Sequence, residues 1–164
     1  MVLDIGCGNN KKEGSIGCDC RMTDSIDVMA DARLLPFRDE VFDYVYSSHV
    51  IEHFSHREVK DVVTEWVRVL KKDGIIEVVC PWLRVSAFYF FLKPNNKHLM
   101  DIYGAQDNEM NYHKCGFTFK QLKELLEQCG IINIKLVWWA GGGKLSFLLF
   151  SEDYQKGPFG MLFA

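Results

Sequence analysis

The sequence predicts a single α/β domain built on a doubly wound, mostly parallel sheet. Three observations favour this class. Short apolar strand patterns alternate with helical ones, the first strand pattern runs into a Gly-x-Gly turn, and the last two strand patterns are joined by three glycines. A chain of 164 residues suits one domain with a core of its own, so we treat residues 1–164 as one unit.

Seven segments have the apolar or alternating pattern of strands. The first three are short and run into Gly6, Asp19 and Asp31. The last two are expected to pair as a terminal antiparallel hairpin across their glycine-rich link. The seven predicted strands are residues 2–5, 15–18, 26–30, 42–46, 75–79, 131–139 and 144–150.

Two helices are predicted from matching start signals. Ser55 with Glu58, and Thr118 with Gln121, have the spacing of a capping box, and each pair precedes an apolar stripe of helical period. Each stripe is followed by a glycine that can end the helix. The stripes and their stops are Val59, Val62, Val63, Trp66, Val67 and Leu70 before Gly74, and Leu122, Leu125, Leu126 and Cys129 before Gly130.

The stretch from residue 81 to residue 116 is too long for an ordinary connection, so we expect it to shape a pocket. It contains the apolar run 86–91, which is interpreted as core, as an acceptor wall or as a dimer contact. The apolar tail, residues 157–164, is expected to dock on its own domain or on a partner.

Composition narrows the class of partner and the compartment. Nineteen basic against 22 acidic residues give a net charge of −3, which argues against bulk attraction to nucleic acid or to an anionic membrane. The six cysteines follow no secretory leader, so we expect reduced thiols and a cytoplasmic protein. No apolar run approaches the ~20 residues of a membrane span.

Three aspartates, Asp4, Asp19 and Asp31, lie in or just after predicted strands near their carboxyl ends. In an open parallel sheet ligands bind beyond these ends, and Gly6 and Gly8 let a ligand approach the backbone. A carboxylate can accept two hydrogen bonds from a ribose diol. The third glycine of a dinucleotide fingerprint and the phosphate-loop motif are both missing from the sequence. The pattern therefore favours a nucleoside cofactor without a pyrophosphate.

Taken together, these residues resemble the class I S-adenosylmethionine-dependent methyltransferases, especially the small type 11 group. The resemblance covers most of residues 1–80 in the order of the family. The segments that carry it are residues 2–8, 19, 31–37, 42–54 and 68–74.

The resemblance implies a Rossmann-like, seven-stranded sheet and S-adenosylmethionine as the cofactor. Ser48 and His49 would face the transferred methyl group. The implied cofactor residues are Asp4, Gly6, Cys7 and Gly8 at the methionine end, Asp19 at the ribose hydroxyls, Asp31 and Ala32 at the adenine, and Ser47 at the methionine ammonium.

Methyl transfer is an in-line displacement, so the protein mainly aligns the acceptor with the methyl group. A general base helps where the acceptor must lose a proton. We take His49 and His53 as the candidate catalytic residues, with Glu52, His98 and His113 as further candidate bases.

Other patterns point to different chemistry. Residues 49–53 match the H-x-x-E-H metalloprotease pattern, but the family's strand motif already accounts for them, so no metal ligand is predicted. Cys7, Cys18 and Cys20 lack C-x-x-C spacing and are interpreted as small buried thiols. Cys80, followed by proline, could act as a covalent nucleophile in RNA methylation, which the acidic balance disfavours.

Two helices usual in the family have no counterpart, one before the first strand and one between the first two strands, because only residues 9–14 separate those strands. We therefore expect a cofactor-binding half at 1–80, an acceptor-recognition loop at 81–117, a helix and hairpin at 118–150 and a tail at 151–164.

The predicted function is methyl transfer to a small-molecule or sugar-like acceptor. We expect that the protein does not bind a membrane, that a nucleic-acid partner is unlikely, and that the chain forms a homo-oligomer. The alternatives are a non-catalytic cofactor-binding or interaction module and, more distantly, an NAD-linked oxidoreductase.

Overall fold

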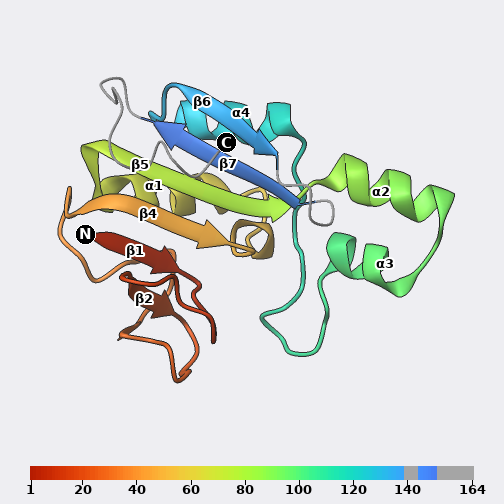
Figure 1. Cartoon of the computed structure of the whole chain (residues 1–164), viewed down its shortest axis with the longest axis horizontal. Helices are drawn as coiled ribbons and strands as arrows, with labels where there is room; N and C mark the ends of the chain where they lie inside the picture. Colours follow the sequence, from red (N-terminus) through yellow and green to blue (C-terminus); the bar gives the residue numbers. More distant parts are fainter. Residues whose placement is uncertain (139–143, 151–164) are drawn as a thin grey trace.

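The computed structural model describes residues 1–138 and 144–150. Five parallel strands form the body of the sheet, in the order β3-β2-β1-β4-β5 (Figure 1). β7 pairs antiparallel with β5, and β6 pairs antiparallel with β7. The expected Rossmann-like α/β class with a parallel sheet is confirmed. The strands are β1 (Val2–Ile5), β2 (Ile16–Asp19), β3 (Val28–Met29), β4 (Phe42–Ser48), β5 (Leu70–Pro81), β6 (Ile134–Trp138) and β7 (Lys144–Phe150).

Two amphipathic helices cover one face of the sheet. Figure 1 shows α1 (Val59–Val69) and α4 (Phe119–Gln128) behind it. They lie side by side, since Thr64 Oγ1 is 3.6 Å from Cys129 Sγ. The buried side of α1 includes Trp66, whose indole N–H donates to the carbonyl of Ala32 at 2.9 Å. This face therefore holds much of the apolar core.

Among the described residues, no helix lies between β1 and β2, as the short spacing predicts. On the front of the sheet, the Lys12 ammonium lies 4.9 Å from the ring centroid of Tyr44 and 4.2 Å from that of Tyr46. The Tyr44 hydroxyl donates to Glu77. These four side chains therefore form a polar and aromatic cluster that joins β4, β5 and the segment after β1.

The first helix differs from its prediction at both ends. The Glu58 carboxylate accepts from the N–H and hydroxyl of Ser55, but within the described chain no N–H donates back to that hydroxyl, and the helix begins at Val59. It ends at Val69, and the chain passes directly into β5 at Leu70. Gly74 is therefore not a helix stop. It lies within β5, where the pairing with β4 shifts register.

The first part of the stretch between β5 and α4 is helical where a loop was predicted. It holds α2 (Leu83–Leu92) and α3 (Asn96–Tyr103), which extend beyond the carboxyl end of β5 (Figure 1). Phe88, Tyr89 and Phe91 are exposed, so the interpretation of this run as core is wrong for these three residues. No helix in the described part of the chain is long and apolar enough to span a membrane. The predicted link 140–143 and tail 151–164 lie outside the described residues.

Candidate active site

A cavity of about 560 Å³ opens at the carboxyl ends of β1, β2 and β4. These ends meet because Ile5 pairs with Cys18 on one side and with Ser47 on the other. The order of strands reverses at β1, and such a switch point is where open α/β sheets bind ligands. Eight residues that the sequence singled out for the site line the cavity: Gly6, Asp19, Asp31, Ala32, Ser48, His49, His53 and His113.

Asp19 ties the glycine turn to the end of β2. Its Oδ2 accepts the N–H of Gly8 at 3.0 Å, and its Oδ1 accepts the N–H of Arg21 at 2.9 Å. The side chain is buried, yet it forms part of the cavity wall. A carboxylate has about four acceptor sites, so two bonds to the backbone leave capacity for the hydroxyls of a ligand.

Asp31 is held by a guanidinium. Arg33 Nη2 lies 2.6 Å from Asp31 Oδ2 and its Nε lies 3.0 Å from both carboxylate oxygens. This pairing lowers the pKa of the Asp31 carboxyl, which stays ionised as an acceptor near neutral pH. The neighbouring Ala32 is fixed by the Trp66 hydrogen bond to its carbonyl. This part of the wall is thus held in place by contacts to α1 and to Arg33.

Four predicted cofactor residues do not line the cavity: Asp4, Cys7, Gly8 and Ser47. Asp4 is buried and accepts the N–H of Lys12 at 2.7 Å, which fastens the turn after β1; burial raises its pKa. Burial raises the pKa of the Cys7 thiol to about 11. The hydroxyl of Ser47 is buried with no hydrogen-bond partner among the described residues. Asp4 thus fastens the turn, whereas the Ser47 hydroxyl makes no such bond among the described residues.

Three histidines line the cavity from two distant parts of the chain. His49 follows β4 with φ +58°, and its Nδ1 lies 3.0 Å from the buried Glu52. His53 belongs to the 3-10 turn η1 (Ile51–His53), and its ring lies 5.1 Å from that of His113, centroid to centroid. Burial lowers the pKa of His113. His98 stacks on Tyr89 in α2 and does not line the cavity, which weakens its case as a base.

The thiol alternatives lose support. Cys80 is fully buried, and burial raises its pKa well above the usual value, so it is a poor nucleophile. Burial also raises the pKa of Cys18 to about 11. Sequence reasoning did not single out several other residues of the wall. These residues are Arg21, Arg33, Asn108, Met110, Asn111 and Lys114. They reach the cavity through the packing of loops, which no sequence motif indicates.

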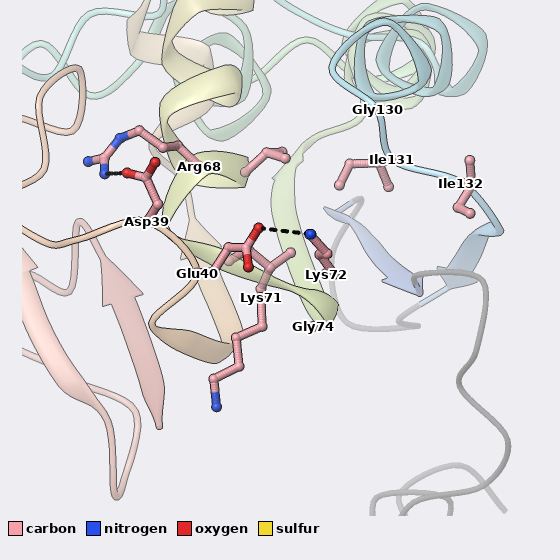
Figure 2. A pocket seen from close by; sticks show the side chains of 11 residues that line it. Asp39, Glu40, Arg68, Lys71, Lys72, Gly74, Gly130, Ile131 and Ile132 are labelled. Atoms are coloured by element: carbon pink, nitrogen blue, oxygen red, sulfur yellow. Dashed lines mark hydrogen bonds and ion pairs between the residues drawn. The ribbon is translucent and has the colours of Figure 1, made fainter.

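A second cavity, of about 370 Å³, lies elsewhere, between the end of α1, the start of β5 and residues 130–132 (Figure 2). Four of its five charged side chains pair with one another, Arg68 with Asp39 at 2.6 Å and Lys72 with Glu40 at 3.8 Å. The fifth, Lys71, pairs with Asp43 at 2.7 Å. None of the predicted site residues lines it. Its charges are therefore already paired, and the candidate chemistry lies at the other cavity.

The strand order, the glycine turn and the two acidic strand ends are those expected from the resemblance to the class I S-adenosylmethionine-dependent methyltransferases, whose cofactor is S-adenosylmethionine. Residues 18–78 match the family model described as a methyltransferase domain, so over these residues the chain is similar to that family. Its fold resembles that of a methyltransferase from Archaeoglobus fulgidus, with a TM-score of 0.68 and 19% identity over 91% of this chain and 85% of the other.

Curated relatives share part of their length with this chain. One is the human "Probable tRNA methyltransferase 9B", 27% identical over 79% of this chain and 36% of the relative. Another is a demethylmenaquinone methyltransferase from Staphylococcus aureus, 32% identical over 79% of this chain and 57% of the relative. The chain thus spans less than two thirds of either protein.

These relatives correct the expected partners. We expected a small-molecule substrate and an unlikely role for nucleic acid. Three relatives are named as tRNA methyltransferases, one of them from Arabidopsis thaliana, so that expectation is not supported. Its physical basis was the net charge of the whole chain, which does not report how charge is distributed over the surface.

Proposed function

We propose that the chain transfers the methyl group of S-adenosylmethionine to an acceptor held between His49 and residues 108–114. One observation carries this proposal. A single cavity is lined by both cofactor carboxylates, Asp19 and Asp31, and by the histidines that follow β4. Its volume of about 560 Å³ lies within the range of about 300–1,000 Å³ that small-ligand sites occupy.

The residues present suit this cofactor. Asp19 would accept from the ribose hydroxyls with the acceptor sites that its backbone bonds leave free. Asp31, kept ionised by Arg33, would accept from the adenine amino group. Asp4, Cys7, Gly8 and Ser47 would act by holding the turn that the methionine end approaches. The cofactor supplies an activated methyl group on a positively charged sulfur.

The protein's own part in the transfer is alignment and removal of a proton. An acceptor atom attacks the methyl carbon, the carbon–sulfur bond breaks, and its electron pair stays on sulfur. Where the acceptor carries a proton, His49 Nε2 would take it, because Glu52 holds the other nitrogen of that ring. His53 would line the acceptor side of the same wall.

A surface next to the cavity favours a nucleic acid as the acceptor. We call it the α2–α3 surface; its basic members are Arg84, Lys93 and Lys97, and its aromatic members are Phe88, Tyr89, Phe91 and Tyr103, all exposed. Exposed aromatic rings stack on unpaired bases, and Arg and Lys neutralise phosphates. The surface is joined to the cavity because the N–H of His113 donates to the carbonyl of Tyr103 at 3.1 Å.

A small aromatic acceptor is the second candidate. The match to the demethylmenaquinone methyltransferase covers more of that relative's length than the matches to the tRNA methyltransferases do, 57% against 36% or less. The exposed aromatic residues of the α2–α3 surface could equally contact a quinone ring.

The test is transfer of a labelled methyl group from S-adenosylmethionine to total tRNA, to demethylmenaquinone in detergent and to buffer alone. We expect label in the nucleic acid, sensitive to ribonuclease and lost in Asp19→Ala. Label found only in the quinone would select the second candidate. Cofactor binding without any transfer would support a non-catalytic module.

A further inference from the structure

Buried Glu52, together with His53 and His113 of the cavity wall, offers ligand atoms that the proposed transfer does not use. Glu52 is 1% exposed, and its Oε1 lies 3.0 Å from His49 Nδ1 and 3.9 Å from His113 Nε2. Its Oε2 is buried and has no hydrogen-bond partner among the described residues. A buried carboxylate oxygen left in this state is costly, so it favours a nearby cation.

In two histidines close to Glu52, a backbone carbonyl holds one nitrogen of the ring. His53 Nδ1 lies 3.1 Å from the carbonyl of Tyr112, and His113 Nδ1 lies 3.2 Å from the carbonyl of Asp101. A carbonyl only accepts, so each Nδ1 carries the proton and each Nε2 of the neutral ring presents a lone pair. Histidines that bind metals are usually held in this way, with the other ring nitrogen bonded to a carbonyl or carboxylate.

These donors converge. One ligand atom from each of Glu52, His53 and His113 lies within 4.8 Å of the others. Atoms around a shared tetrahedral ion stand roughly 3.3–3.6 Å apart, since each is about 2.0–2.2 Å from the ion. The three side chains would therefore draw together by up to about 1.3 Å to complete the set. His53 and His113 also line the cavity, so an ion here would face the bound acceptor.

The geometry points to a divalent transition-metal site formed by Glu52, His53 and His113, with His49 positioning the Glu52 carboxylate. Two imidazoles and a carboxylate suit ions such as Zn²⁺, Co²⁺ or Mn²⁺, and three protein ligands leave coordination positions open. The site deepens the proposed methyl transfer and rests on it for its role: an open position would bind an acceptor oxygen and lower the pKa of a hydroxyl.

This site is not the one that the H-x-x-E-H pattern suggests. That pattern needs His49 and His53 on successive turns of one α-helix, whereas residues 51–53 form only a short 3-10 turn. The third ligand comes from His113, which the fold brings next to Glu52 although the two are 61 positions apart in the sequence. Sequence spacing therefore carries no sign of the set.

The test is calorimetric titration of the chelator-treated chain with Zn²⁺, together with the visible absorption of bound Co²⁺. We expect one ion per chain. His53→Gln and His113→Gln should each weaken binding by more than about tenfold. The matched control is His56→Gln, the same substitution at an exposed histidine outside the set, which should bind as the unmodified chain does.

Binding of S-adenosylhomocysteine serves as the folding check for every variant, because the carboxylates assigned to the cofactor lie outside the proposed metal set. The site is refuted if the unmodified chain takes up no stoichiometric ion, or if His53→Gln and His113→Gln match the control. A chain that binds the ion through these residues but transfers no methyl group would keep the metal site and remove the proposed function.

Discussion

At the scale of single residues, Gly6 shows how one position joins two strand ends. Its φ is +69°, and a Cβ placed there would lie 2.2 Å from Val50 Cγ2. The segment after β4 therefore packs directly on the turn after β1. Gly14 has nearly the same φ, +72°, but open space around the same direction. The pair separates the cost of a left-handed backbone from the cost of a steric clash.

We expect Gly14→Ala to lower the free energy of unfolding by about 1 kcal/mol, from the backbone conformation alone. Gly6→Ala should cost roughly 1–3 kcal/mol more, because the methyl group meets Val50. Urea unfolding measures both. Adding Val50→Ala to Gly6→Ala should recover part of the loss, and equal costs at the two glycines would contradict the steric account.

Asp19 provides the residue-scale test of the cofactor site. Its carboxylate holds the glycine turn and, under our proposal, also accepts from the ribose hydroxyls. Hydrogen bonds to a charged group contribute roughly 1.5–3 kcal/mol, so Asp19→Ala should weaken S-adenosylhomocysteine binding about 10- to 100-fold in calorimetry. Asp73→Ala, at an exposed carboxylate, is the control. Equal affinities for the two variants would exclude Asp19 from the site.

Site residues whose position depends on the local sequence pattern could be predicted from the sequence. Asp19 and Asp31 line the cavity because each follows or ends an apolar strand of the parallel sheet. Asp4 lies within β1 rather than beyond it, so its carboxylate is buried and bonds the Lys12 N–H. The contact between Glu52 and His113 depends on packing across the fold, which periodicity does not encode.

At the scale of elements, one start signal produced two different helix beginnings. The Thr118 side chain accepts the N–H of Gln121, and the Gln121 side chain accepts the N–H of Thr118, so this capping box is complete. Ser55 lacks the first of these bonds within the described part of the chain. Identical spacing therefore predicts a helix nearby without fixing its first residue.

We expect Thr118→Ala to lower the free energy of unfolding by about 1 kcal/mol, the usual cost of losing an N-cap side chain. Ser55→Ala should cost less, since its hydroxyl satisfies no N–H at the start of the described helix α1. Thermal and urea unfolding of the two variants measure the difference. A larger loss at Ser55 would show that its bond to Glu58 matters more than the cap.

The helices α2 and α3 were missed for a physical reason. Residues 83–92 of α2 are apolar almost throughout and bury only Ser86, so they carry no one-sided stripe that a helical period could reveal. α1 and α4 each bury one face and were found from that stripe. Periodicity thus reports helices that pack on a core and misses a helix whose apolar side chains stay exposed.

The Glu65–Arg68 pair fastens a loop to α1. Arg68 donates to the carboxylate of Glu65 at 2.7 Å and to the carbonyls of Leu35 and Phe37, while Glu65 accepts the N–H of Leu35. The bonds from Arg68 lower the pKa of Glu65. A carboxyl with a lowered folded pKa adds stability above its unfolded value, about 4.5, and loses it as the pH falls through the folded value.

Glu65→Gln should therefore cost roughly 1–2 kcal/mol of unfolding free energy at pH 7. The gap to the unmodified chain should close progressively below pH 4.5, as Glu65 becomes protonated in both states. Urea unfolding across this range measures it. Glu124→Gln, at an exposed pair with Lys120, should show no such dependence. A gap that does not change down to about pH 2 would contradict the role of the charge.

At the scale of the whole molecule, one face of the sheet differs from the other. α1 and α4 cover one face (Figure 1). Tyr44 and Tyr46 alternate along β4 with the buried Val45, so their cluster with Lys12 and Glu77 lies on the other face. The charge of the whole chain is −3, yet residues 83–103 carry Arg84, Lys93 and Lys97 against Asp101 alone. The net charge of the whole chain does not show this local excess of positive charge beside the cavity.

This distribution predicts where a nucleic acid would bind. Replacing Arg84, Lys93 and Lys97 with Gln should weaken tRNA binding and lower the slope of log affinity against log salt by about 0.7–0.9 for each phosphate that is no longer neutralised. The control replaces Lys60, Lys72 and Lys120, three exposed lysines outside the α2–α3 surface, and removes the same total charge. Fluorescence anisotropy over a salt series measures both chains. The two triple variants differ only in where the charges lie. If only the first variant loses affinity and slope, the tRNA binds at the α2–α3 surface. If the control loses as much, binding follows net charge and the α2–α3 surface is not where the tRNA binds.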